Sequence, residues 1–217
     1  MKSLWLHLQL LDKVLRHLVN IRKSFKQVLD RLLKEQKIPQ KTFWQIDPIG
    51  CQPGILYGLS KVHKTLVRGL PKMRPILSAI GTAGYGLSKF LVPILKLVAI
   101  GPYTVLNTFS FNREVLTQDP NLVMGSLDVD ALFTSIPLDE TIDICVNELY
   151  KEKDLVEKLN KDDMKSLLNL ACKDTLFMFD GIYYNQIDGV AMGSPLGPTL
   201  ANCFMNFHEK IWLEKCC

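Results

Sequence analysis

Two short apolar runs joined by Asp180-Gly181 constrain the fold of this 217-residue chain more than any other feature. An Asp-Gly pair readily adopts the two positive φ angles of a type I′ turn, so residues 175–179 and 182–185 are predicted to form an antiparallel hairpin. Elsewhere, apolar residues recur with helical periods. Helices and hairpins follow each other without the regular alternation of a doubly wound sheet, and we therefore expect an α+β fold.

The first part of the chain carries a long helical stripe that ends near Pro39. Its spacing suits a coiled-coil seam or a helix packed on its own domain, and the second is favoured because the flanking charges are mostly basic rather than paired. Residues 1–41 hold ten Lys or Arg and three acids, which gives a basic amphipathic arm of charge +7 in a chain of net charge +4. This arm suits a partner with phosphates and is equally compatible with a solvated helix face. The stripe consists of Leu4, Leu8, Leu11, Leu15, Leu18, Phe25, Leu29 and Leu32.

Turn signals and apolar runs predict the remaining elements. Prolines and glycines punctuate residues 39–54, which we interpret as a linker. Residues 55–62 and 74–80 are predicted to be paired strands, and a helix is expected over 84–99, bent or broken at Pro93. Three more helices are predicted: one beginning at Asp139 and Glu140, one capped by Asp162 that runs to about Lys173, and one carrying Leu200, Phe204, Phe207 and Ile211.

Two aspartates stand at the end of an apolar run, Leu122–Val129, that is predicted to be a buried strand. Because side chains alternate along a strand, Asp128 and Asp130 are expected on one face. A hard cation such as Mg²⁺ would explain carboxylates at the mouth of a sheet. Two alternatives stay open on these residues alone. The acids mark the exit of the strand into solvent, or they form the D-x-D of a glycosyltransferase that holds a nucleotide-sugar diphosphate through its metal.

Basic side chains crowd the predicted strand pair between residues 55 and 80. Arginine forks and lysine point charges are suited to grip a triphosphate, and the alternative is an exposed hairpin kept soluble by its charges. The residues concerned are Lys61, His63, Lys64, Arg68, Lys72 and Arg74.

Residues 189–202, GVAMGSPLGPTLAN, form the most informative stretch. Small residues that open a helix let a backbone or a base approach closely, and the start of the helix presents free N–H groups. A tight corner between a hairpin and a helix has the same composition, so composition alone leaves both interpretations open.

The order of these pieces decides between the interpretations. GLSKVHK (58–64) and MRPILSAIG (73–81) precede SLDVDALFTSIPLDETI (126–142), and GVAMGSPLGPTLANCFM (189–205) follows. The first two resemble the fingers, and the last two resemble the first and second palm motifs, of reverse transcriptases from Penelope-like retroelements. The resemblance covers about residues 50–210.

The resemblance implies a right-hand polymerase architecture within the α+β class. The basic arm at 1–41 would precede a fingers-like region at 42–115 and a partial palm at 116–217. The implied function is that of an RNA-directed DNA polymerase with two Mg²⁺ ions as cofactors. Its partners would be an RNA template, a DNA primer and deoxynucleoside triphosphates.

Three residues of the first palm motif receive roles from the resemblance. Asp128 matches the first catalytic aspartate, a ligand of both metal ions. The backbone carbonyl of Val129 would bind one of these ions. Phe133 matches the aromatic side chain beneath the sugar that disfavours a 2′-hydroxyl group.

The fingers and the second palm motif supply the other implied nucleotide contacts. Arg74 matches the arginine that contacts the incoming triphosphate, with Lys64 or Lys61 as its lysine partner, and hairpin spacing favours Lys64. Met192 and Gly193 match the pair that packs near the templating base, and methionine at the first position is usual in the Penelope-like group.

The pattern departs from the family in one respect that affects activity. A Tyr-x-Asp-Asp hairpin, whose carboxylates would complete the metal site, is absent, and Asp162-Asp163 stands in the wrong order to replace it. One carboxylate holds two divalent cations poorly, so we expect a polymerase fragment that is inactive alone. The alternative is a decayed, non-catalytic remnant that binds nucleic acid. The strand of Asp128 would also lack the hairpin beside it, which predicts an exposed edge.

The apolar and cysteine patterns bear on location. The early apolar run is interrupted by His7, Gln9 and Asp12, so no signal peptide is expected and no membrane partner is predicted. The six cysteines lack C-x-x-C spacing, which favours free thiols in a reducing compartment. An intracellular protein, nuclear or cytoplasmic, is the resulting expectation.

Overall fold

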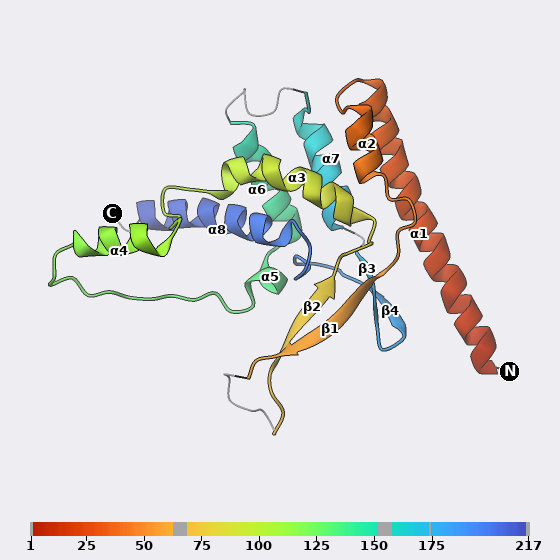
Figure 1. Cartoon of the computed structure of the whole chain (residues 1–217), viewed down its shortest axis with the longest axis horizontal. Coiled ribbons are helices and arrows are strands. Elements are labelled where there is room, and N and C mark those ends of the chain that lie inside the picture. Colours follow the sequence, from red (N-terminus) through yellow and green to blue (C-terminus); the bar gives the residue numbers. More distant parts are fainter. Residues whose placement is uncertain (1, 63–68, 152–157, 174, 216–217) are drawn as a thin grey trace.

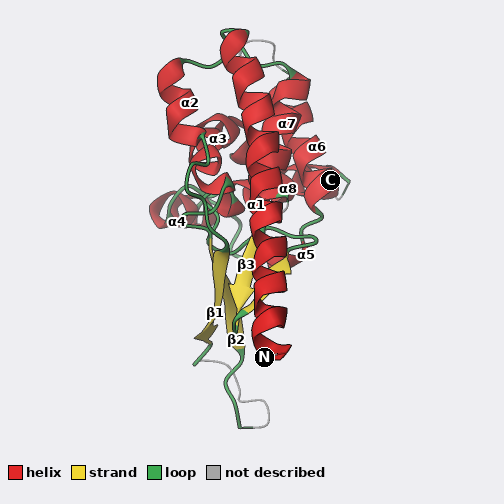
Figure 2. Ribbon diagram, turned by 90° about the vertical axis from the view of Figure 1, so that its right-hand side faces the viewer, coloured by secondary structure: helices red, strands yellow, loops and turns green. Residues whose placement is uncertain are grey.

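The computed structural model describes residues 2–62, 69–151, 158–173 and 175–215, with the side chains of residues 2–12 left out. Most helices gather at one end of the molecule and the strands lie at the other, with the N-terminal helix running alongside both (Figure 2), which confirms the α+β class. In chain order (Figure 1), the elements are α1 (Lys2–Lys34), α2 (Gln40–Ile46), β1 (Gly54–Ser60), β2 (Met73–Ser78), α3 (Gly84–Ala99), α4 (Thr108–Leu116), α5 (Leu132–Ser135), α6 (Leu138–Leu149), α7 (Lys161–Cys172), β3 (Leu176–Phe179), β4 (Ile182–Asn185) and α8 (Gly197–Glu214).

One four-stranded sheet, in the order β2-β1-β3-β4, joins segments from both halves of the chain. β1 and β2 are antiparallel, as predicted, and β1 runs parallel to β3. β3 and β4 form the predicted hairpin, with φ angles of 49° at Asp180 and 71° at Gly181. Two positive φ angles are the signature of a type I′ turn, so the local turn chemistry decides this element.

The core lies in the helical end, where α3 contacts α6, α7 and α8. Leu87, Leu91 and Leu95 of α3 are fully buried there. Of the predicted bend or break at Pro93, the break is wrong, because α3 continues from Gly84 to Ala99. Pro93 itself is exposed, and the buried leucines before and after it hold both halves of the helix against the same neighbours.

The C-terminal half of α1 packs on the chain's own core, as expected. Phe25, Leu29 and Leu32 are at most 1% exposed. Toward the N-terminus the helix extends away from the helical layer (Figure 1), and Leu15 and Val19 are about half exposed. A buried carboxylate on α7 anchors the packed half: Asp163 Oδ1 lies 2.7 Å from Arg31, and its Oδ2 lies 2.6 Å from Lys37.

Two smaller expectations are corrected by the structure. The segment interpreted as a linker contains a helix, α2, whose Ile46 is buried. The cap of α7 is Asn160 and not Asp162, because the Asn160 side chain accepts from the backbone N–H of Asp163 while Asp163 accepts from that of Asn160. This reciprocal pair is a capping box that lacks a Ser or Thr. None of the described helices has the length and apolar character needed to cross a bilayer.

Candidate functional site

Three segments that are distant in sequence line one open hollow of about 490 Å³. Lys61 and Arg74 come from the β1–β2 hairpin, and Met192 comes from the stretch before α8. Residues 128–133 supply the remaining wall, which includes Asp128, Val129 and Phe133. The hollow thus brings together residues to which the resemblance assigns one nucleotide site. Lys64 lies outside the described residues, and Lys61 is the lysine that the structure places here.

The basic wall of the hollow continues the β1–β2 ladder. Leu59 is paired with Arg74, and beyond the strand the amide of Lys61 donates to the carbonyl of Lys72 at 2.7 Å. This backbone hydrogen bond holds Lys61 and Arg74 at the same end of the β1–β2 hairpin. Neither side chain forms an ion pair with a described residue, so both cations are available to an anion.

The acidic wall differs from the predicted buried strand. Residues 121–130 adopt no regular structure, and all of their side chains are exposed, Leu127 completely. A strand needs a neighbour for its backbone groups, and the described part of the chain places no strand beside this segment. Asp128 and Asp130 nevertheless both line the hollow.

A left-handed residue ends the acidic wall. Ala131 has φ 52° and ψ 39°, a conformation that costs a residue with a Cβ about 1 kcal/mol or more. The carbonyl of Ala131 accepts hydrogen bonds from Thr134 and Ser135, which starts α5 immediately after the carboxylates. This turn directs the chain from the exposed segment back toward the body, where Phe133 is half-buried.

The third wall is a backbone bridge between the other two. The amide of Val190 donates to the carbonyl of Phe133 at 2.7 Å, and the carbonyl of Met192 accepts from the amide of Leu77 on β2 at 2.8 Å. Gly189 and Gly193 have positive φ angles of 76° and 127°. A Cβ on Gly193 would lie 2.3 Å from the carbonyl oxygen of Leu77.

Glycine is therefore required in this stretch for contact with the protein's own backbone. Gly189 meets α5 in the same way, since a Cβ there would lie 2.9 Å from the carbonyl oxygen of Thr134. Gly193 itself lines a neighbouring hollow with Phe133 and Met192. The predicted close approach to these glycines is present, and the approaching groups are the backbones of β2 at Gly193 and of α5 at Gly189.

Asp188 supports this bridge and was not singled out in the sequence. Its Oδ1 accepts from the amide of Leu138 at 3.0 Å and from that of Gly189 at 2.7 Å. These backbone hydrogen bonds lower the pKa of the Asp188 carboxyl group. The carboxylate thereby joins the start of α6 to the start of the bridge. An Asp before Gly is the one local signal for it, because short polar side chains bond nearby backbone in turns.

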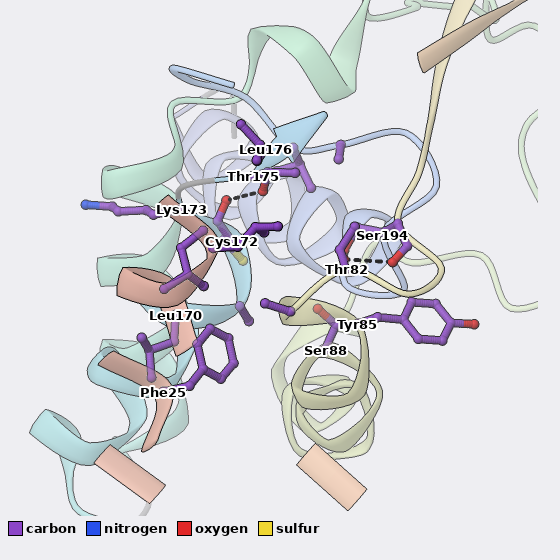
Figure 3. A pocket seen from close by; sticks show the side chains of 18 of the residues that line it. Phe25, Thr82, Tyr85, Ser88, Leu170, Cys172, Lys173, Thr175, Leu176 and Ser194 are labelled. Atoms are coloured by element: carbon purple, nitrogen blue, oxygen red, sulfur yellow. Dashed lines mark hydrogen bonds between the residues drawn. The ribbon is translucent and has the colours of Figure 1, made fainter. Parts of the chain in front are cut away.

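Behind the bridge lies a small cavity of about 40 Å³ between α1, α3 and α7 (Figure 3). Thr82 donates to the carbonyl of Ala79 at 2.7 Å, and Thr175 donates to that of Cys172 at 3.2 Å. Burial raises the pKa of the Cys172 thiol to about 12, so this thiol stays protonated. The cavity has room for little more than a water molecule, so we interpret it as a small gap in the packing of α1, α3 and α7 beneath the bridge.

The donor set of the hollow suits one hard cation better than two. Asp128, Asp130 and the carbonyl of Val129 are oxygen donors of the kind that Mg²⁺ prefers. Within the described ranges, no group of three or more His, Cys, Asp or Glu side chains is arranged to hold a metal ion. A single Mg²⁺ bound here would have to take its other ligands from water or from a bound ligand. A pair of ions held by the protein does not fit these residues.

Comparisons with known proteins do not identify a family for this chain. The chain matches no protein-family model, no curated protein and no solved structure.

Proposed function

We propose that the hollow binds the triphosphate and sugar of a deoxynucleoside triphosphate, and that the chain is part of an RNA-directed DNA polymerase of a retroelement. The convergence of Lys61, Arg74, Asp128, Phe133 and Met192 supports this proposal. These residues come from three distant segments, and each matches a position in or beside the nucleotide and metal site in the resemblance to Penelope-like reverse transcriptases.

The proposed roles follow from the chemistry of each wall. Arg74 presents a planar fork that suits phosphate oxygens, and Lys61 adds a compact positive charge. Asp128 would hold a Mg²⁺ ion that arrives with the triphosphate. In the complete polymerase, bound Mg²⁺ supplies charge stabilisation for transfer of a nucleotide to the primer 3′-hydroxyl. The ring of Phe133 would lie beneath the sugar and disfavour a 2′-hydroxyl group.

Equilibrium binding of Mg²⁺ with dTTP to the full chain tests the proposal. Arg74→Ala is expected to weaken binding at least tenfold, because a charge-assisted hydrogen bond to phosphate contributes about 1.5–3 kcal/mol. Arg113→Ala is the matched control, since Arg113 is exposed on α4 and does not line the hollow. Equal weakening by both variants would refute the assignment of the site.

A second measurement addresses the sugar and the competing ligand class. Phe133→Ala is expected to raise the affinity for UTP relative to dTTP, because the ring no longer opposes the 2′-hydroxyl. A nucleotide sugar such as UDP-glucose is expected to bind more weakly than dTTP. Tighter binding of the nucleotide sugar would favour the glycosyltransferase alternative.

The second candidate function is a non-catalytic remnant that binds nucleic acid. The observation that favours it is the small number of carboxylates at the hollow, where Asp128 and Asp130 are the acidic side chains. Binding of Mg²⁺ with dTTP distinguishes the two candidates. The polymerase fragment is expected to bind both at the hollow, whereas the remnant is expected to bind template and primer without a requirement for them.

A further inference from the structure

The two faces of α1 differ in exposure: one packs on the body of the protein and the other faces solvent. Val14, Phe25, Leu29 and Leu32 are buried, so the body of the protein covers most of the apolar face in the C-terminal half of the helix, whereas Leu15 of the apolar stripe is about half exposed. At 100° per residue, Arg16, Lys23 and Lys34 fall on one line on the opposite side of the helix, because their spacings of seven and eleven residues are close to whole turns. Lys13 and Lys26 flank this line.

Four lysines on this face keep their charges unpaired after folding. Lys13, Lys23, Lys26 and Lys34 are exposed and form no ion pair with a described residue. Asp30 is the acidic residue that interrupts the described part of the face. By contrast, Arg31, five whole turns after Lys13 on α1, and Lys37, beyond the end of the helix, are engaged by Asp163. The fold thus uses two cations for packing and presents a row of lysines to solvent.

We propose that this outer face of α1 is a docking surface for the phosphate backbone of a nucleic-acid duplex, separate from the nucleotide hollow. Charge complementarity identifies the partner. The row from Lys13 to Lys34 spans about 30 Å at 1.5 Å per residue, close to the roughly 34 Å of one duplex turn. A straight helix of this length can meet phosphates on both sides of a groove.

A membrane surface fits this face less well. A helix that lies in a bilayer interface inserts a broad apolar face below its basic one. Here the described apolar face packs on the core through Phe25, Leu29 and Leu32, and Leu15 and Val19 are the apolar side chains left about half exposed beside the lysines. A nucleic-acid duplex would contact the exposed lysines and would not need the apolar face, which is packed on the core.

Fluorescence anisotropy of a labelled 24-base-pair duplex, titrated with the full chain at several salt concentrations, tests this surface. Lys23→Glu with Lys26→Glu is expected to weaken binding at least tenfold near 100 mM salt. Each lost phosphate contact reduces the salt slope by about 0.9, so the slope should fall by nearly two. Asp30→Lys is expected to tighten binding and to steepen the slope. All three substituted positions are exposed, and circular dichroism checks the helix content.

The control variant carries the same change in net charge on other elements. Lys96→Glu with Arg113→Glu, on α3 and α4, is expected to change the affinity less than twofold. Equal losses in both double variants would overturn the proposal, because net charge alone would then explain binding. Displacement of the duplex by polyglutamate at equal charge, or tighter binding to vesicles containing phosphatidylserine, would also overturn it. Arg74→Ala is expected to bind the duplex normally, so failure of the hollow and failure of this surface are distinguishable.

Discussion

The backbone amide of Leu77 donates a 2.8 Å hydrogen bond to the carbonyl of Met192, which attaches the stretch before α8 to the edge of β2. This bond closes the hollow on one side, because Met192 lines the hollow and Leu77 belongs to the strand that also carries Arg74. The residue after Met192 is a glycine, so no side chain separates the two backbones. The shape of the hollow therefore depends on a close backbone contact between segments distant in sequence.

Gly193→Ala is expected to destabilise the fold by about 2 kcal/mol or more and to weaken nucleotide binding. Its new Cβ would lie 2.3 Å from the carbonyl oxygen of Leu77, at a φ of 127° that residues with a Cβ rarely adopt. Urea unfolding measures the first effect. Gly125→Ala is the control, because nothing lies within 4 Å of its Cβ position, and it should change stability by less than about 0.5 kcal/mol. Equal stability of the two variants would mean that the bridge is not tightly packed.

Asp163→Asn is expected to cost about 2 kcal/mol at neutral pH, because the ion pairs with Lys37 and Arg31 are lost. Burial opposes ionisation of Asp163, but the hydrogen bonds from Lys37, Arg31 and the Asn160 amide lower its pKa overall. A lowered pKa in the folded state means that the stabilisation is fully present above about pH 4, the ordinary range of an aspartate, and is lost as the pH falls through the lowered value.

The stability difference between the parent chain and Asp163→Asn should therefore be constant from neutral pH to about pH 4 and shrink below it. Denaturant unfolding at a series of pH values measures it. Asp162→Asn is the matched control, since Asp162 is exposed in the same helical turn. A stability difference that grows with acidification would mean that folding raises the pKa of Asp163 instead of lowering it.

Asp188→Ala is expected to lower stability by about 1 kcal/mol, the usual cost of removing a side chain that caps a helix. Asp188→Asn keeps an oxygen acceptor for Leu138 and Gly189 and should recover most of that loss. Thermal unfolding of both variants at pH 7 compares them. If the asparagine variant were as unstable as the alanine variant, the charge would matter more than the acceptor.

Primer extension by these 217 residues is expected to be undetectable with either Mg²⁺ or Mn²⁺. The hollow offers Asp128 and Asp130 as its acidic side chains, and the described residues hold no group of three metal-binding side chains. Incorporation of labelled dTTP on an RNA template with a DNA primer is the measurement. Sustained incorporation, abolished by Asp128→Asn, would show that the site is complete as it stands.

Local signals in the sequence were sufficient for much of the fold. The β3–β4 hairpin follows from Asp180-Gly181, and α6 follows from carboxylates placed at the positive end of a helix dipole. The run Leu122–Val129 has the composition of a strand, but composition cannot supply a neighbouring strand. At α7, two adjacent aspartates look alike in sequence. Asn160 becomes the cap because the helix begins at Lys161, before either aspartate.

At the site, the order of motifs predicted which segments belong together, and the hollow contains residues from each of them. The sequence could not predict how they are joined. The hydrogen bonds from Leu77 to Met192 and from Val190 to Phe133 link positions whose separation along the chain carries no periodic signal. The glycines were recognisable as points of close approach, but the identity of the approaching group depends on tertiary placement.

The exposed segment that carries Asp128 has a consequence for the energetics of ligand binding. Residues 123–130 donate no backbone hydrogen bond within the described part of the chain, and the segment is fixed mainly where it leaves α4 and where it enters α5. Arg74 and Met192, in contrast, belong to a bonded framework. A ligand that bridges the two sides must therefore order the backbone of the carboxylate side at a cost in conformational entropy, whereas the backbone of the other side is already held by hydrogen bonds. Any contact that orders this segment in advance would raise affinity without touching the ligand.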